Sequence, residues 1–177
     1  MSEQKQVLVR RLRAIEPTRG AEVGVFIGKT SAHLLASFPG LHLYMVDAWD
    51  GRAYSTSEDP ISLRGDFDSL HQRAMDRTAP YRVRTTVLRM PSLLAADQVE
   101  NGSLDFAFID ADHSYAATLA DCRAWWPKVR PGGILFGHDY GWKVKWLEGC
   151  TQAYNEFGAD VDVKPVIDDW WVVCFYK

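Results

Sequence analysis

Two short polar stretches carry the side chains best suited to acid–base or metal chemistry. They are Asp110-Ala-Asp-His-Ser-Tyr115 and His138-Asp-Tyr140, and each directly follows an apolar run of strand length. Carboxylates and imidazoles are common proton carriers and metal ligands in proteins. Asp110, His138 and Asp139 are therefore the candidate catalytic residues.

These three side chains could activate a bound nucleophile in either of two ways. They could hold a divalent cation that lowers the pKa of the nucleophile, or His138 could act directly as the general base. Oxygen ligands suit Mg²⁺, whereas an imidazole shifts the preference toward Mn²⁺, Fe²⁺ or Zn²⁺. The residue types leave the presence and the identity of a metal open, with Mg²⁺ and Mn²⁺ as the candidates.

A glycine-containing stretch near the N-terminus has the pattern of a ligand-binding turn. Ala21-Glu-Val-Gly-Val-Phe-Ile-Gly-Lys-Thr-Ser31 runs from apolar residues through Gly24 and Gly28 into helix-forming residues. Glycines allow a sharp turn and the close approach of a ligand, and the start of the following helix presents free N–H groups. The pattern predicts a strand, a tight turn and a helix.

Two acids strengthen this interpretation. Glu22 lies inside the stretch, and Asp47 ends the next apolar run. An acid at the end of the second strand of a doubly wound fold hydrogen-bonds ribose hydroxyls. The pair predicts a cofactor that contains a nucleoside.

The spacing of the glycines argues against two other cofactor classes. The sequence has no G-x-G-x-x-G triplet of the kind that holds a dinucleotide pyrophosphate, and no G-x-x-x-x-G-K-[ST] phosphate-binding loop. A dinucleotide oxidoreductase on a similar sheet is therefore a disfavoured alternative, which preferential binding of a nicotinamide cofactor would revive.

Hydrophobic patterning predicts alternating strands and helices that would position these residues. The predicted helices cover residues 1–16, with an apolar stripe from Val7 to Ile15, and then 29–37, 66–77, 92–98, 114–129 and 144–157. The predicted strands cover residues 21–26, 41–46, 83–88, 104–109, 134–138, 161–166 and 171–176. Only four residues join the last two strands, which leaves no room for a crossover helix, so we expect an antiparallel hairpin beside a parallel sheet.

The order of the motifs along the chain is similar to one known family. E-V-G-V-F-I-G, V-D-A-W, D-F-A-F-I-D-A-D-H-S-Y and R-P-G-G-I-L-F-G-H-D-Y resemble the small-molecule, O-methyltransferase-like branch of class I S-adenosylmethionine-dependent methyltransferases, in which I-D-x-D-H-S-Y and G-G-x-x-x-x-H-D are typical. The resemblance implies an α/β fold with a Rossmann-like, doubly wound, seven-stranded sheet. The sheet would be mostly parallel, with strand order 3-2-1-4-5-7-6.

The resemblance also implies which residues hold S-adenosylmethionine. The turn around Glu22, Gly24 and Gly28 would surround its methionine part, Asp47 would bind the ribose, and Ser92 would lie near the adenine. The implied cofactor-binding residues are Glu22, Gly24, Gly28, Asp47, Ala48, Trp49, Ser92, Asp110, Ala111, Asp112 and His113.

The three candidate catalytic residues match the metal positions of related cation-dependent O-methyltransferases. Asp110, His138 and Asp139 stand where those enzymes place an acid after the fourth strand and an acid–amide pair after the fifth. The His-Asp pair is a departure from that pattern. The three residues are the implied metal ligands.

Some of these residues also have structural interpretations. Asp112 or Ser114 could cap the helix that follows, which is compatible with a catalytic role nearby. His113 is either a residue on the adenine side or a polar residue at a strand end. His138 could also be a structural histidine.

The expected reaction is methylation of a small molecule, on a sugar or phenolic hydroxyl, assisted by a metal or by a base. The alternatives are a non-catalytic module that binds S-adenosylmethionine and an N-methyltransferase of the same fold. Cofactor binding without methyl transfer would favour the module.

Composition sets the remaining expectations. A chain of 177 residues with 47% hydrophobic and 24% charged residues has the length of a single domain, here 1–177. The net charge of −3 makes nucleic acid an unfavoured partner. Three widely spaced cysteines indicate neither a disulfide framework nor a zinc site.

Other segments lead to weaker expectations. The polar N-terminus and the lack of a long apolar run predict no membrane segment and a cytoplasmic location. The aperiodic stretch 48–65 is a candidate lid loop. A second copy of the chain, in a homodimer, could complete the substrate pocket.

Overall fold

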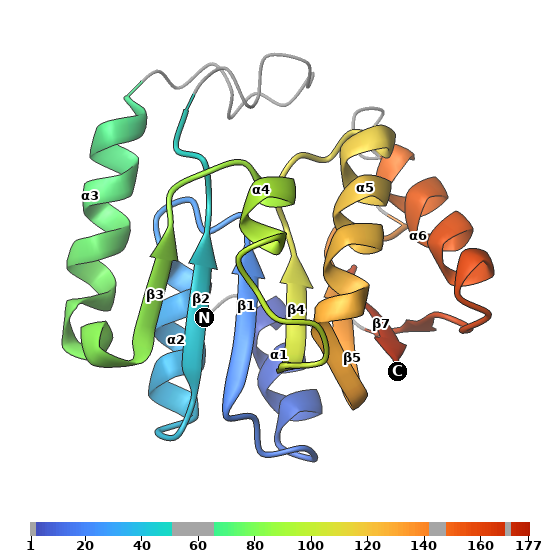
Figure 1. Cartoon of the computed structure of the whole chain (residues 1–177), viewed down its shortest axis with the longest axis horizontal. Helices are drawn as coiled ribbons and strands as arrows, with labels where there is room; N and C mark the ends of the chain where they lie inside the picture. The colour runs from blue at the N-terminus through green and yellow to red at the C-terminus, as the bar shows by residue number, and fades with distance from the viewer. Residues whose placement is uncertain (1–2, 51–65, 142–147, 169–170) are drawn as a thin grey trace.

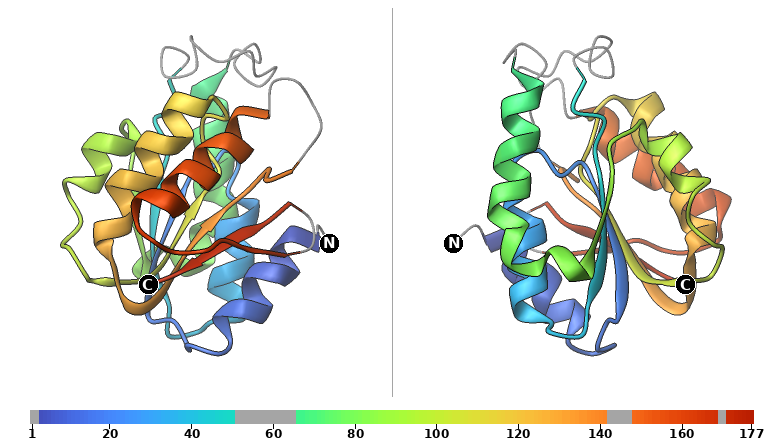
Figure 2. Two further views of the ribbon diagram at one scale, coloured as in Figure 1. Left: turned by 90° about the vertical axis from the view of Figure 1, so that its right-hand side faces the viewer. Right: turned by 60° about the vertical axis from the view of Figure 1, so that its left-hand side comes forward.

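A seven-stranded sheet forms the middle layer of the molecule, and helices cover both of its faces (Figures 1 and 2). The computed structural model describes residues 3–50, 66–141, 148–168 and 171–177. The strand order is β3-β2-β1-β4-β5-β7-β6. This confirms the predicted doubly wound order and the Rossmann-like fold class.

The strands differ in direction only at one end of the sheet. Neighbours from β3 to β5 pair in parallel, whereas β7 pairs antiparallel with both β5 and β6. The predicted C-terminal hairpin is therefore present. The strands are β1 Arg19–Val23, β2 His42–Val46, β3 Thr85–Leu88, β4 Leu104–Ile109, β5 Val129–Gly137, β6 Val166–Ile167 and β7 Val173–Tyr176.

The helices divide into two layers (Figure 2). On one face lie α1 Glu3–Leu12, α2 Lys29–Ser37 and α3 Phe67–Thr78. On the other lie α4 Ser92–Ala96, α5 Tyr115–Trp125 and α6 Glu148–Asp160. Two short 3₁₀ helices, Ala79–Arg84 and Trp126–Lys128, lead into β3 and β5.

The sequence of β4 explains how one sheet serves two cores. All six of its residues are buried. Because successive side chains of a strand point to opposite faces, Phe106 and Phe108 pack with the α1–α3 layer, whereas Ala107 and Ile109 pack with the α4–α6 layer.

Several predicted boundaries were wrong. β1 ends at Val23 rather than residue 26, because Gly24 has a φ of 96°. β3 begins at Thr85 rather than residue 83, since the preceding residues form a 3₁₀ helix. At the C-terminus β6 has only two residues and β7 begins at Val173.

The segment around Pro127 was also predicted incorrectly. α5 ends at Trp125 rather than residue 129, because a 3₁₀ helix that contains Pro127 begins at Trp126. β5 then begins at Val129, five residues earlier than predicted. Most of the candidate lid 48–65, and the start of the helix predicted at 144–157, lie outside the described residues.

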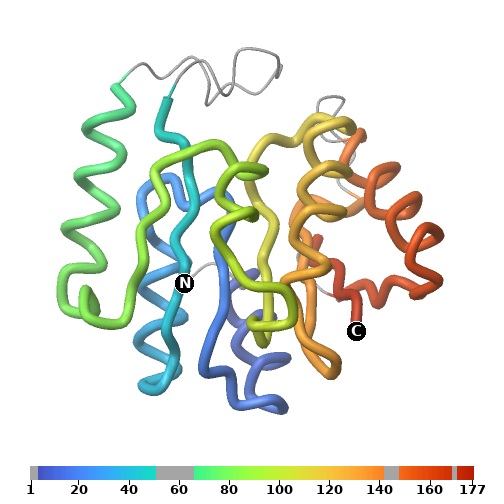
Figure 3. The backbone as a smooth tube through the Cα atoms, viewed as in Figure 1, coloured from blue at the N-terminus to red at the C-terminus, as the bar shows by residue number. Residues whose placement is uncertain are grey.

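The parallel strands all end at the same edge of the sheet, which is the upper edge in Figure 3. This edge carries the segments that follow β1, β2, β3, β4 and β5. Among the residues that the structure describes, no helix has the length and apolarity to cross a lipid bilayer.

Candidate active site

The turn after β1 brings two strand ends into contact. Gly24 donates its N–H to the Val46 carbonyl at 2.8 Å. A Cβ atom at Gly24 would lie 2.0 Å from the carbonyl oxygen of Asp110. Only glycine fits this contact, and its φ of 96° is also one that other residues rarely adopt.

Asp47 fixes the path of the chain around this turn. Its Oδ2 accepts the Phe26 N–H and its Oδ1 accepts the Trp49 N–H, both at 2.8 Å. The buried indole of Trp49 donates to the Phe26 carbonyl at 2.8 Å. Ala48 links Asp47 to Trp49 in the chain and lines a cavity beside this turn.

Glu22 lies beneath the same turn and is almost completely buried. The Ser31 hydroxyl, from the start of α2, donates a hydrogen bond to its carboxyl group. Burial raises the pKa of Glu22 to about 8, and the charges of Asp110 and Asp47 act in the same direction. The site therefore contains an acid that is largely protonated at neutral pH.

Two neighbouring cavities open around these groups. A cavity of about 240 Å³ is bounded by Glu22, Thr30 and His113, among others. A larger, more apolar cavity of about 510 Å³ lies between α4 and α5. Gly24, Asp47 and Ala111 line both cavities. Gly28 lies at the start of α2 with a φ of 70° and contacts Ala74.

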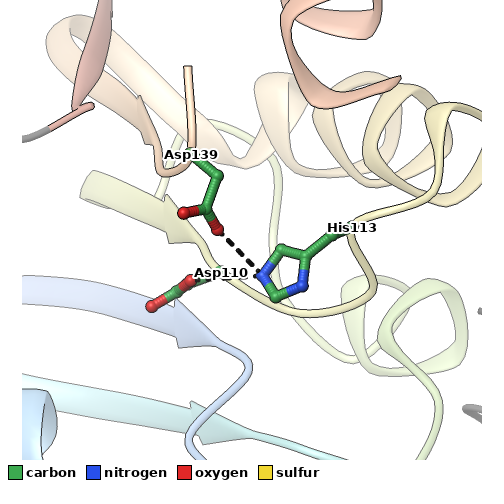
Figure 4. Close-up of side chains that lie close together, drawn as sticks. All are labelled: Asp110, His113 and Asp139. Atoms are coloured by element: carbon green, nitrogen blue, oxygen red, sulfur yellow. Dashed lines mark ion pairs between the residues drawn. The ribbon is translucent and has the colours of Figure 1, made fainter. Parts of the chain in front are cut away.

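A cluster of two acids and two imidazoles lies at the adjacent ends of β4 and β5. His138 Nδ1 is 3.3 Å from Asp110 Oδ1 and 3.1 Å from Asp139 Oδ1. His113 Nε2 is 3.0 Å from Asp139 Oδ2 and 3.7 Å from Asp110 Oδ1. Figure 4 shows the His113 ring turned toward Asp139. The structure thus brings the predicted catalytic residues together and adds His113 to them.

The segment between β4 and α5 explains how His113 reaches the cluster. The Asp112 carboxylate accepts the Ser114 N–H at 2.8 Å, and the Ser114 hydroxyl caps α5 by accepting the Ala117 N–H. Ser114 is thus the helix cap, as one predicted interpretation had it. These two bonds turn the chain back on itself so that His113 faces Asp139, a placement that the sequence interpretation missed.

The electrostatics of the cluster favour an ion pair. Burial opposes the charged form of His138, but Asp110 and Asp139 outweigh it and raise the pKa of the imidazole to about 10. Burial would raise the pKa of Asp110 and Asp139, but the neighbouring histidines outweigh it and lower both. At neutral pH His138 is a cation held between two carboxylates.

The donor set is suited to a divalent cation. One ligand atom from each of Asp110, His113 and Asp139 can be chosen so that all three lie within 4.8 Å of one another. Two carboxylates and an imidazole suit Mn²⁺, and carboxylates with water suit Mg²⁺. His113, rather than His138, is the imidazole that borders the smaller cavity.

Helix α1 contributes two further residues to the site. Gln4 donates to Asp110 Oδ2 at 3.3 Å, and both Gln4 and Lys5 line the smaller cavity. Burial lowers the pKa of Lys5, assisted by the charge of Lys29. The sequence pattern predicted this helix but held no local signal that links it with Asp110, more than a hundred positions away.

Ser92 occupies the start of α4 and lines the larger cavity. Its hydroxyl accepts a hydrogen bond from Trp125 Nε1 at 2.9 Å and also hydrogen-bonds Asp121. Neither α5 residue was identified from the sequence as part of a site.

Comparison with known protein families gives one match that covers most of the chain. A family described as a methyltransferase domain matches residues 21–140. An uncharacterized protein, y4gI, of Sinorhizobium fredii is 25% identical over 132 residues, which are 72% of this chain and 14% of that protein. The chain thus spans a small part of that relative's length.

Comparison with solved structures gives the same fold. An O-methyltransferase from Bacillus cereus, solved with S-adenosylhomocysteine, has a TM-score of 0.68 at 17% identity, covering 100% of this chain and 82% of that one. The O-methyltransferase TomG from Streptomyces achromogenes, solved with S-adenosylmethionine, has a TM-score of 0.67 at 16% identity, covering 100% and 81%. A methyltransferase from Podospora anserina, solved with S-adenosylhomocysteine, has a TM-score of 0.68 at 14% identity, covering 98% and 77%.

Proposed function

The chain belongs to the family of methyltransferase domains, and from this premise we propose that it transfers a methyl group from S-adenosylmethionine to a hydroxyl of a small molecule, a sugar or a phenol. One observation carries the proposal. The smaller cavity runs from the Glu22–Gly24 turn to Asp110 and His113, so a cofactor bound at the turn would have proton-accepting groups beside it. The bound structures of similar fold support the choice of cofactor.

The two cavities suit the two halves of this cofactor. The methionine part would lie in the smaller one, between Glu22 and the start of α2, with Lys5 and Lys29 available to its carboxylate. The ribose would hydrogen-bond the Asp47 carboxylate, between Gly24 and Ala48. The adenine would then enter the larger cavity, toward Ser92 and between Ala111 and Asp112.

The acid–imidazole cluster would activate the acceptor. When bound, S-adenosylmethionine supplies a methyl group on a positively charged sulfur. His113 borders the cavity, and because its Nε2 faces the Asp139 carboxylate, Nδ1 is the ring nitrogen that would accept the hydroxyl proton, while Asp139 orients the ring and stabilises the imidazolium that results. His138 keeps the two carboxylates charged and in place.

A divalent cation would fit the same cluster. Asp110, Asp139 and His113 would hold it, with His138 as the alternative imidazole. It would lower the pKa of the acceptor hydroxyl and stabilise the negative charge that develops on that oxygen. The proposal thus keeps two routes to an activated hydroxyl, a metal and an imidazole base.

Calorimetric titration with S-adenosylmethionine and S-adenosylhomocysteine tests the cofactor assignment. We expect micromolar binding that Asp47→Asn weakens at least tenfold, whereas Asp97→Asn, which changes an exposed acid directly after α4, leaves the affinity unchanged. No binding of either compound would refute the proposal.

Sedimentation of the same samples measures whether two copies form the expected homodimer.

Methyl transfer to a panel of sugars, phenols and amines tests the chemistry. His113→Ala should reduce turnover by about 10²–10⁴-fold if the ring is the base. Activity that is lost on chelation and restored by Mn²⁺ or Mg²⁺, together with stoichiometric Mn²⁺ binding in spin-resonance titrations, would select the metal. Transfer to amines alone would indicate an N-methyltransferase, and binding without any transfer would indicate a non-catalytic module.

A further inference from the structure

The larger cavity is almost entirely apolar except at a few points on its wall. Pro91, Leu93, Leu94, Ala117 and Ala120 contribute carbon atoms to it, a composition that suits a flat aromatic ring. Among its polar side chains, Asp47 also borders the smaller cavity, whereas Ser92, Asp112 and Asp121 border only the larger one. Asp112 already accepts the Ser114 N–H at 2.8 Å. A nucleoside with its ribose at Asp47 would therefore direct its base toward Ser92 and Asp121.

The hydrogen bonds of Ser92 fix the polarity of this part of the wall. An indole nitrogen can only donate, so the 2.9 Å bond from Trp125 Nε1 uses one lone pair of the Ser92 oxygen. The single hydroxyl proton is then free to be donated to the Asp121 carboxylate. The hydrogen-bonded series from Trp125 through Ser92 to Asp121 therefore presents only hydrogen-bond acceptors to a ligand.

Asp121 itself is an unusual residue for this position. It is 5% exposed and lies on the buried side of α5. Within the described residues, no lysine or arginine forms an ion pair with it. Burial raises its pKa to about 7, which the Ser92 bond partly opposes. A buried carboxylate without a cation is costly unless further donors reach it.

We propose that Asp121, with Ser92 held by Trp125, recognises the exocyclic amine of the cofactor's base and selects a 6-aminopurine over a 6-oxopurine. An amine offers two N–H donors to the acceptors of the wall. An oxo group at the same carbon would place its lone pairs against the carboxylate. The inference rests on the proposed function, and it assigns Asp121 a role in specificity.

A pair of ligands that differ at C6, and with it in the protonation of the neighbouring N1, tests the inference. S-adenosylhomocysteine and its deaminated counterpart, S-inosylhomocysteine, are titrated against the unmodified chain at pH 8.5, above the pKa of Asp121. Since a hydrogen bond to a charged group is involved, we expect the adenine compound to bind about 10- to 100-fold more tightly. Equal affinities would overturn the inference while leaving the proposed function standing.

Variants locate the source of the preference. Asp121→Asn supplies an amide donor to the oxo group. The affinities of this variant for the two compounds should therefore differ by no more than about threefold. Ser92→Ala, which keeps the Asp121 side chain but removes its hydrogen bond from Ser92, should lower the preference partially. Asp97→Asn, directly after α4, should keep the full preference of the unmodified chain.

The remaining outcomes are also decisive. Full preference in folded Asp121→Asn would show that another group reads the base and would overturn the inference. Should that variant fail to fold, an undiminished preference in Ser92→Ala would overturn it equally. No binding of either compound to the unmodified chain would refute the proposed function and this inference together.

Discussion

Glu22 combines near-complete burial with the hydrogen bond from Ser31. Its carboxyl group has a pKa of about 8 in the folded protein, mainly because of burial, against 4.5 as its ordinary value. Between these two values the folded state holds a proton that the unfolded state has released. The stability contributed by this proton is full below pH 4.5 and is lost as the pH rises through about 8.

Glu22→Gln removes this titration and retains an acceptor for the Ser31 hydroxyl. We expect its stability, relative to the unmodified chain, to rise between pH 5 and pH 8 by up to about 1.4 kcal/mol per pH unit, the limit for one proton. Urea denaturation at each pH measures the difference. A constant difference across this window would contradict the protonated state of Glu22.

Gly24 illustrates a different constraint, that of backbone contact. Gly24→Ala would place a Cβ atom 2.0 Å from the Asp110 carbonyl oxygen and strain a φ of 96°. We expect a loss of about 2–4 kcal/mol in the free energy of unfolding, and loss of cofactor binding, because the ends of β1 and β4 must separate. Denaturation and calorimetry measure both effects.

Gly40→Ala is the matched control for that substitution. Nothing lies within 4 Å of a Cβ atom at Gly40, so its stability should change by no more than about 0.5 kcal/mol. Equal effects of the two substitutions would show that the close contact between Gly24 and Asp110 is not the cause of the lost stability.

Single residues at strand ends were the part of the site that the sequence could indicate. Asp47 and Asp110 follow apolar runs, and this local pattern places them at one edge of a parallel sheet. The positions of Gln4 and Asp121 could not be predicted, since they depend on how α1 and α5 pack. His113 was missed as a member of the cluster because its direction depends on the turn that Asp112 and Ser114 make.

At the level of elements, Asp105 joins the starts of two strands on either side of β4. Its Oδ2 accepts the backbone N–H groups of Thr18 and Arg19 at 2.6 and 2.8 Å, and its Oδ1 accepts Arg130 Nε at 2.7 Å. Burial alone would raise the pKa of Asp105, but these bonds outweigh it and lower the pKa. The carboxylate thus holds β1, β4 and β5 in register at the edge opposite the site.

Asp105→Asn replaces one acceptor oxygen by an amide that cannot accept. We expect a loss of about 2–3 kcal/mol in the free energy of unfolding at pH 7, as for other buried hydrogen-bonded charges. In the unmodified chain this contribution is present above the ordinary pKa of 3.8 and is lost as the pH falls through the lower folded value. The difference in the free energy of unfolding between the two proteins should therefore narrow toward pH 2–3, as measured from denaturation curves. A difference that is independent of pH would exclude the ionised carboxylate as its source.

Elements with strong local signals were predicted well, and those set by pairing were not. Residues 29–37 and 104–109 were predicted with the observed bounds of α2 and β4. The Arg130-Pro-Gly-Gly133 segment has the composition of a turn, yet it belongs to β5, because Val129 pairs with Leu104 before the register shifts. Tertiary pairing overrode the local preference there.

For the whole molecule, the sheet order was predictable because the motifs occur in a known order along the chain. The two packed layers were not assigned in advance. They share the strands between them, with Phe106 and Phe108 in one layer and Ala107 and Ile109 in the other. Loss of packing in either layer would expose one face of strands that also form the core of the other layer.

This arrangement leads to a prediction about unfolding. Leu35 of α2 and Phe157 of α6 are fully buried in opposite layers. Leu35→Ala should lower the free energy of unfolding by about 2–5 kcal/mol and Phe157→Ala by about 3–5 kcal/mol, mostly through lost burial and the cavities that remain. Because the shared strands couple the layers, each variant should lower the midpoint of one common transition, with an unchanged dependence on denaturant.

Circular dichroism and tryptophan fluorescence in urea report on backbone and packing separately, so their curves should coincide in both variants. The double variant should lose the sum of the two free energies within about 0.5 kcal/mol, because the sheet separates the two sites. If Phe157→Ala instead splits the unfolding curve, the α4–α6 layer opens by itself. The cavity between α4 and α5 would then belong to a locally opening unit rather than to the cooperative core, and cofactor binding would have to stabilise that layer first.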